Sequence, residues 1–152
     1  LIILNRMIGS NLHNIPKEFK LYSTVDGKFS STIGPYYIKG KYPNTIFGVK
    51  ILDKQTNLNK VAHGGFLMAF ADTIGGNIAY NSIKKRSVTA TFNCSFLRPI
   101  PINSWVLGKG KIKRAGKRAI FVEISLTIDN ELVFTANGLW QIINIANNIH
   151  NH

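Results

Sequence analysis

The clearest pattern in the chain is an apolar run between Gly64 and about Tyr80, spaced so that it covers nearly every side of a helix. Its members are Phe66, Leu67, Met68, Ala69, Phe70, Ala71, Ile74, Ile78 and Ala79. A surface helix keeps one polar face, whereas a helix that is apolar all round is buried. The pattern therefore predicts one long helix in the core of the protein.

The residues before this helix have the pattern of strands. Residues 36–38 and 46–52 are rich in β-branched and aromatic side chains, and the turn-like sequence Lys41-Tyr42-Pro43-Asn44 separates them. Such a pair of segments around a turn is typical of a β-hairpin. We expect both to be strands.

After the helix the period changes to two. The apolar residues Val88, Ala90, Phe92, Cys94 and Phe96 alternate with Ser and Thr and with Asn93, which predicts a long strand with one apolar and one polar face. Three further strands are expected at about 104–113, 118–128 and 131–143. They are joined by residues 114–117 and by Asp129-Asn130, whose Gly and Asx residues suit tight antiparallel turns. We expect a meander after the helix.

Together these elements predict a single α+β domain, in which a curled antiparallel sheet of about six strands wraps around one long central helix. Residues 1–29 are interpreted as an N-terminal leader, with a short helix expected before Gly34-Pro35. Residues 30–143 form the predicted domain and residues 144–152 a polar C-terminal tail.

Composition and charge narrow the location and the partners. The single cysteine, Cys94, excludes an internal disulfide framework and favours the reducing cytoplasm. The apolar N-terminal run is shorter than the core of a signal peptide, and polar residues interrupt 64–83, so we expect neither secretion nor a membrane span. A net charge of +12 implies attraction to polyanions, which include nucleic acid, anionic membranes and phosphorylated small molecules.

One residue conflicts with the apolar run. Asp72 is the only formal charge between Ala62 and Ile83. An ionised group in apolar surroundings loses its hydration, which costs several kcal/mol unless something compensates it. Asp72 therefore pairs with a surface lysine, lies in a contact between subunits, or takes part in catalysis.

The sequence around Asp72 resembles a known family. The stretch NLNKVAHGGFLMAFADTIGGNIAYNS is similar to the hotdog-fold acyl-CoA thioesterases of the phenylacetate-pathway (PaaI-like) branch, in which an Asn stands six residues before the His of a His-Gly-Gly turn and an Asp nine residues after it. The matching residues are Asn57, His63, Gly64, Gly65 and Asp72. The similarity continues through GPYYIK, SVTATFNCSFLRPIPINSWVLGKG and TANGLWQI, and covers about residues 30–143. Gln55 departs from the branch, which often has a His there, and we leave it out of the predicted site.

The resemblance implies hydrolysis of an acyl-CoA to the free acid and coenzyme A. The first turn of a helix has free N–H groups and a partial positive charge, so it can hold a developing oxyanion. Glycines let a carbonyl approach the backbone closely and tolerate unusual dihedral angles. The resemblance implies that the N–H of Gly64 is the donor to the thioester oxygen, with Gly65 beside the substrate.

Helix geometry adds a prediction about assembly. Asp72 lies eight positions after Gly64, which is about 12 Å along one helix, whereas reacting groups must come within about 3–3.5 Å. Two helices that run antiparallel across a two-fold axis would bring Asp72 of one copy to the Gly64 turn of the other. We therefore predict a homodimer, or a tetramer built from dimers, with a shared site, which is also the family arrangement.

The resemblance and the chemistry of the side chains imply the remaining roles. Asp72 is predicted to be the nucleophile or the general base that delivers water. Asn57 could orient the carbonyl or the water. Thr89 aligns with a hydroxyl residue of the related enzymes and could hold the attacking water, although threonine is also favoured in strands for its propensity alone. His63 is expected to fix the turn rather than to act as a base.

Substrate contacts are predicted from charge and size. The basic residues Lys113 and Arg114, with Arg98, are candidates for the phosphates of coenzyme A, although a Lys/Arg run is usually a solvated turn. Phe66 and Met68 suggest an apolar or aromatic acyl group but could equally be core. No ligand spacing for a metal is present, and we expect no cofactor beyond the coenzyme A of the substrate.

Two alternatives remain open. The first is a hotdog dehydratase or hydratase acting on a 3-hydroxyacyl or enoyl thioester. The second is a domain that binds acyl-CoA or nucleic acid without turnover, although no nucleic-acid recognition pattern is visible. We expect neither a nucleic-acid nor a membrane partner.

Overall fold

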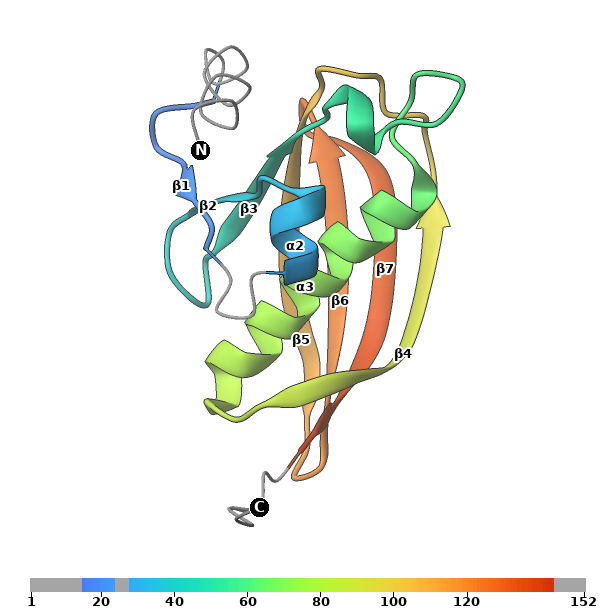
Figure 1. The fold of residues 1–152 in the computed structure, drawn as a ribbon. Coiled ribbons are helices and arrows are strands. Elements are labelled where there is room, and N and C mark those ends of the chain that lie inside the picture. The colour runs from blue at the N-terminus through green and yellow to red at the C-terminus, as the bar shows by residue number, and fades with distance from the viewer. Residues whose placement is uncertain (1–14, 24–27, 144–152) are drawn as a thin grey trace, which may run out of the picture.

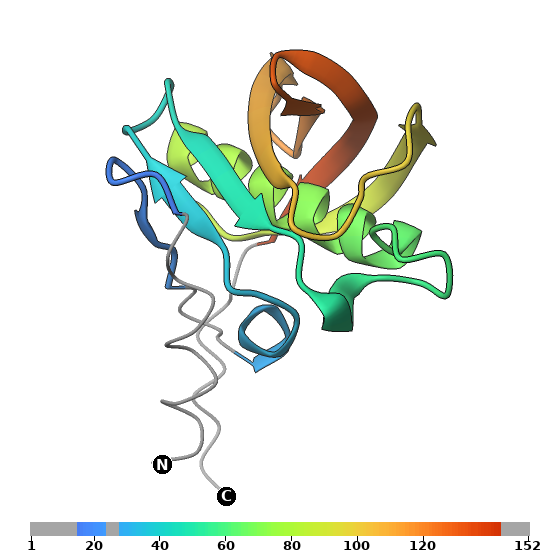
Figure 2. The same ribbon diagram turned by 90° about the horizontal axis from the view of Figure 1, so that it is seen from above.

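The computed structural model describes residues 15–23 and 28–143 and confirms the α+β fold (Figure 1). The central helix α3 spans Gly64–Ile83 and lies in the concave face of a curled sheet (Figure 2). The other elements are, in chain order, β1 (Lys20–Leu21), α2 (Lys28–Ile33), β2 (Tyr37–Lys39), β3 (Ile46–Lys50), the 3-10 helix η2 (Asp53–Gln55), β4 (Ser87–Phe96), β5 (Trp105–Ala115), β6 (Ala119–Ile128) and β7 (Glu131–Ile142).

The order of the strands differs in one respect from the expected meander. All pairs are antiparallel, and the strand order is β1-β2-β3-β5-β6-β7-β4. Strands β5, β6 and β7 form the meander, but β4 pairs with β7 instead of its successor β5, so residues 97–104 cross the end of the sheet. As a result, β4 is an edge strand, and its other side carries no partner within the described residues.

The three predicted hairpins, β2–β3, β5–β6 and β6–β7, are confirmed. β2 pairs with β3 in register Ile38 to Phe47. Between β6 and β7, Asp129 and Asn130 both have positive φ, at 48° and 66°. Two central residues with positive φ form a type I′ turn, whose twist matches that of the flanking strands.

The core lies between one face of α3 and the inner face of the sheet. Phe70, Ile74 and Ile78 of the helix are fully buried against β-strand residues that include Val106, Ile124 and Trp140. The approach is close, because a Cβ on Gly75 would lie 2.2 Å from the Trp140 ring. Here glycine supplies room for packing rather than backbone freedom.

The opposite face of α3 is open, which the sequence pattern did not predict. Met68 and Tyr80 are 39% and 49% exposed, and Asp72 is half-buried on the same side of the helix. Along β4, Val88 and Phe96 are also about half exposed. A helix predicted to be buried on every side is therefore only partly covered within a single chain.

The N-terminal region contributes to the fold. The short helix expected before Gly34-Pro35 is α2, which lies on the side of α3 away from β5–β7 (Figure 2). Strand β1, which the sequence analysis did not predict, pairs with β2, and Phe19 packs edge-on against Trp105. The polar tail, 144–152, lies outside the described residues. Within those residues, no helix is long and apolar enough to span a membrane.

Candidate active site

The His-Gly-Gly sequence forms the start of α3. His63 is the N-cap residue, with φ −65° and ψ 134°, and its Nδ1 accepts a hydrogen bond of 3.0 Å from the N–H of Gly65. Its carbonyl oxygen also accepts from the N–H groups of Phe66 and Leu67. The structure thus gives His63 a capping role, which fixes the first turn of the helix.

The N–H of Gly64 is the free donor of this turn. The N–H of Gly65 is used by His63, whereas the described part of the chain provides no acceptor for the N–H of Gly64. Neither glycine has positive φ, so the expected need for unusual dihedral angles is wrong. The need at Gly64 is for space, since a Cβ there would lie 3.2 Å from the Phe96 ring.

A pocket of about 320 Å³ opens beside this donor. Its walls come from the loop before α3, the first turn of α3, and the end of β4 with the segment that follows. The lining residues are Val61, Ala62, Gly64, Leu67, Phe96, Leu97, Arg98, Pro99 and Ile100. Apart from the Gly64 backbone and the Arg98 side chain, the lining is apolar. Sequence reasoning placed Gly64 and Arg98 in the site but missed the 96–100 wall, for which the only signal was the run FLRPI at the end of a strand.

Asp72 and Thr89 meet on the open face of α3. The hydroxyl of Thr89 donates a hydrogen bond of 2.6 Å to Oδ1 of Asp72. The simple alternation expected along this strand would put Thr89 on the face opposite to Phe92. Instead, the register shifts between Thr89 and Thr91, so that Thr89 is paired with Trp140 and Phe92 with Gly138.

The physical reason for this correction is a β-bulge. An extra residue in one strand reverses the alternation beyond it and re-aims the neighbouring side chains. Paired residues in an antiparallel ladder point to the same face, and Trp140 is buried against α3. The bulge at Ala90 therefore turns Thr89 toward the helix, where it reaches Asp72.

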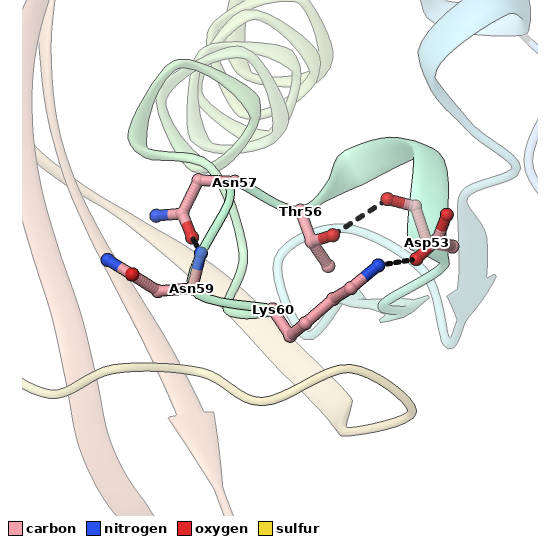
Figure 3. Close-up of polar contacts among 5 residues, drawn as sticks. All are labelled: Asp53, Thr56, Asn57, Asn59 and Lys60. Atoms are coloured by element: carbon pink, nitrogen blue, oxygen red, sulfur yellow. Dashed lines mark hydrogen bonds and ion pairs between the residues drawn. The ribbon is translucent and has the colours of Figure 1, made fainter.

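Asn57 lies on the loop between η2 and α3 (Figure 3). Its side-chain oxygen accepts from the N–H of Asn59 at 2.9 Å, and its N–H donates to the Val61 carbonyl. An ion pair of 2.8 Å between Lys60 and Asp53 closes the same loop. The side-chain NH₂ of Asn57 has no partner in the described part of the chain, and this is the group it could offer to a substrate oxygen.

The predicted substrate contacts are spread over the molecule. Arg98 lines the pocket and pairs with Glu131 at 2.5 Å. Lys113 forms an ion pair with Glu123 at 3.2 Å. Both Lys113 and Arg114 lie at the end of β5, beyond the C-terminal end of α3 (Figure 1). Phe66 is buried beside Tyr36, so its role is in the core, whereas Met68 is on the open face. The described residues contain no cluster of three or more potential metal ligands.

Within one chain, the predicted site is divided into two separate halves. Gly64, Arg98 and the pocket form one half at the start of α3. Asp72 and Thr89 form the other half, about 12 Å further along the helix. The two halves do not meet in a single chain.

Comparison with known proteins identifies the family of this chain. The sequence model of the thioesterase superfamily matches residues 59–135. A protein of Thermoplasma volcanium, described only provisionally as an esterase, is 31% identical over 134 residues, which cover 86% of this chain and 91% of that one.

Solved structures share the fold. A variant of the phenylacetic acid degradation protein PaaI from Thermus thermophilus superposes with a TM-score of 0.69 at 18% identity, over 76% of this chain and 98% of that chain. A hypothetical thioesterase from Streptococcus pneumoniae, with coenzyme A, gives 0.68 at 20% identity, over 72% and 86%. The hotdog fold expected from the resemblance is confirmed, and the chain belongs to the thioesterase superfamily.

Proposed function

We propose that this protein hydrolyses an acyl-CoA thioester in a site shared between two copies of the chain. The observation that carries the proposal is the division of the site into two halves on one helix: a free N–H beside an apolar pocket at its start, and a carboxylate held by a threonine further along. The bound coenzyme A of the S. pneumoniae relative supports this class of substrate.

The first half would stabilise the transition state. Water adds to the thioester carbon, and the carbonyl oxygen gains negative charge. The N–H of Gly64 would donate to that oxygen, and the helix N-terminus adds a partial positive charge. The NH₂ of Asn57 is a second donor available to the same oxygen or to the water.

The second half would deliver the water, and we propose that Asp72 is the general base. Because the Thr89 hydroxyl donates its proton to Asp72, its oxygen still has lone pairs to accept a proton from water. Water held between the two gives one proton to Asp72 and its oxygen to the thioester carbon. The C–S bond then breaks, and the thiolate of coenzyme A takes the proton from Asp72, which restores the carboxylate.

A single turnover in heavy-oxygen water tests this role. General-base catalysis puts the label only into the released acid. A nucleophilic Asp72 would form an anhydride, and attack of water on its aspartyl carbonyl would leave label in the aspartate. Label in Asp72 after one turnover would therefore contradict the general-base role.

A second copy of the chain would unite the halves. If Asp72 of one copy faces Gly64 of the other across a two-fold axis, the axis passes near residue 68, midway between them, where Met68 is exposed. The unpaired edge of β4 lies beside the same open face. Exposed apolar residues and a free strand edge are what a self-complementary interface would cover.

The same geometry gives the basic residues a use. Antiparallel helices would carry the C-terminal end of one α3 past the start of its partner, because Ile83 lies eleven positions, or about 16 Å, beyond Asp72. Lys113 and Arg114 would then lie on the far side of the reacting groups from the axis, where they could contact coenzyme A phosphates that extend away from the thioester, while Arg98 is at the pocket wall. The apolar lining favours an apolar acyl group. We also propose a cytoplasmic location, which fits the lone Cys94.

Two variants, mixed in one dimer, test the shared site. Gly64→Pro removes the donor at the first helical position, where proline is tolerated, and the extended ψ of His63 suits a following proline. Gly64→Ala is the matched control, because it adds a Cβ but keeps the N–H. Asp72→Asn inactivates the other half.

Homodimers of Gly64→Pro and of Asp72→Asn should each release little thiol from an acyl-CoA. A tandem-tagged heterodimer of the two has one intact site of two, so it should show about half the wild-type kcat per dimer. If both halves acted within one chain, the heterodimer would be as inactive as its parents. A wild-type chain that is monomeric and active would also rule out sharing.

A further inference from the structure

Gln55, on the 3-10 helix η2, is a buried polar residue with every part of its side chain bonded. It is only 3% exposed. Its Nε2 donates to the Ile33 carbonyl at 2.6 Å and, more weakly, to that of Gly34 at 3.4 Å, while its Oε1 accepts from the N–H of Leu52 at 2.7 Å. A buried polar group needs such partners, because burial of an unpaired donor or acceptor lowers the stability of the fold.

These bonds join η2 to the end of α2. The last carbonyls of a helix have no partner within it. Here Gln55 reaches Ile33, and the neighbouring Lys54 donates from Nζ to the Thr32 carbonyl at 2.7 Å. Two consecutive side chains of η2 thus bond to consecutive carbonyls at the end of α2, and the two elements lie side by side (Figure 2).

The backbone of Gln55 connects to the other side, the start of α3. Its carbonyl accepts from the N–H of His63 at 2.8 Å. The next residue, Thr56, forms an isolated β-bridge with Ala62, and Asn57 follows. One residue therefore links the end of α2 to the His63 cap and to the loop that carries Asn57.

We propose that Gln55 is a positioning residue that sets the orientation of the Gly64 N–H and of Asn57. The inference rests on the proposed function for the role of these two groups. It assigns α2, which precedes the residues matched by the family model, a part in holding the site. Through Gln55, a helix on the far side of α3 from the meander fixes where the cap of α3 begins.

The first test replaces the side chain and keeps its size. Gln55→Leu leaves the Leu52 N–H and the Ile33 carbonyl without their partner, so the 55–63 loop should loosen. Small displacements of positioning groups have large kinetic effects, and we expect kcat to fall between about tenfold and a hundredfold. KM should change less, because most of the pocket lining lies outside this loop, in the first turn of α3 and the 96–100 wall.

Val122→Ala is the matched control for lost stability. Val122 is fully buried on β6, close to the β5–β6 turn and remote from the loop. Both variants should lower the melting temperature, but only Gln55→Leu should lower kcat well below melting. An equal kcat in the two variants would show that Gln55 is merely structural.

Gln55→Glu supplies a pH signature that loss of stability would not. A carboxylate would face the Ile33 and Gly34 carbonyls, whereas the protonated acid can still donate to Ile33 and accept from Leu52. The ratio of its kcat to that of the wild type should therefore rise as the pH falls. A ratio that stays flat with pH would overturn the proposal.

Amide hydrogen exchange separates this inference from the proposed function. In Gln55→Leu, peptides that cover residues 56–66 should exchange faster than in the wild type, while Val122→Ala leaves them unchanged. A wild type that hydrolyses no acyl-CoA would refute the function, and the exchange rates would still decide whether Gln55 holds the loop. Unchanged exchange in 56–66 would refute the positioning role.

Discussion

The two faces of α3 differ in how complete they are. On the face toward β5–β7, Phe70, Ile74 and Ile78 are fully buried, and glycines let the helix approach the sheet closely. On the other face, Met68 and Tyr80 are exposed, and among the described residues Asp72 is held only by Thr89, from an edge strand. A single chain therefore buries the first face and leaves much of the second exposed.

This difference separates stability from catalysis. The closed face holds the hydrophobic core, so substitutions there should act on the free energy of unfolding. The open face holds the carboxylate and its threonine, and it offers apolar surface with little to bury it. Substitutions there should act on turnover with little effect on stability, and the following changes test that division.

The largest effect is expected for Asp72→Asn. The amide keeps the shape of the side chain but cannot take a proton from water, so kcat should fall between about a hundredfold and ten-thousandfold. Steady release of thiol from a panel of acyl-CoAs measures the loss. The melting temperature and the oligomeric state should stay at the wild-type values, and a variant that retained its kcat would remove Asp72 from the chemistry.

The next effect belongs to the closed face. Ile124 on β6 is fully buried, and Ile124→Ala leaves a cavity that should cost about 2–5 kcal/mol of unfolding free energy. Urea denaturation followed by circular dichroism measures it. Below the transition, kcat should stay within about twofold of the wild type; a loss of turnover without a loss of stability would contradict the division between the faces.

A smaller effect is expected for Thr89→Val, which keeps the branched shape and removes the hydroxyl. A hydrogen bond to a charged group contributes about 1.5–3 kcal/mol, which corresponds to a fall in kcat of roughly tenfold to a hundredfold. Thr89→Ser restores the hydroxyl and should recover most of the activity. If Val and Ser behave alike, the 2.6 Å contact with Asp72 has no part in turnover.

Sequence reasoning found the closed face because period and composition report burial. The apolar run predicted α3, and Asp129-Asn130 predicted the β6–β7 hairpin, because a helix and a tight turn both depend on residues that are neighbours in the chain. Strand order was harder: nothing local to β4 indicates that it pairs with β7 rather than β5. The apolar pattern also missed the open face, because an apolar helix looks the same whether its own chain or a second copy covers it. Only the spacing of Gly64 and Asp72 pointed to a second copy.

The site shows the same limit in finer detail. Spacing alone placed Asp72 and Gly64 on one helix, and the motif supplied their partners. It could not place the bulge that turns Thr89 inward, because a one-residue slip leaves the composition of a strand unchanged. Gln55 was set aside as a departure from the family pattern, although its burial and hydrogen bonds connect α2 to the cap of α3.

The smallest effect should come from Cys94→Ala, which tests whether a thiol on the inner side of β4 takes part in turnover. Cys94 pairs with Ala136 on the inner side of β4, and burial raises the pKa of its thiol. A raised pKa keeps the group as the neutral thiol at neutral pH, and the thiolate is the nucleophilic form. The variant should therefore keep kcat within about twofold, and iodoacetamide should label the wild-type thiol slowly. Rapid labelling that abolished thioester hydrolysis would instead put the reactive group on β4 and displace Asp72 from the centre of the mechanism.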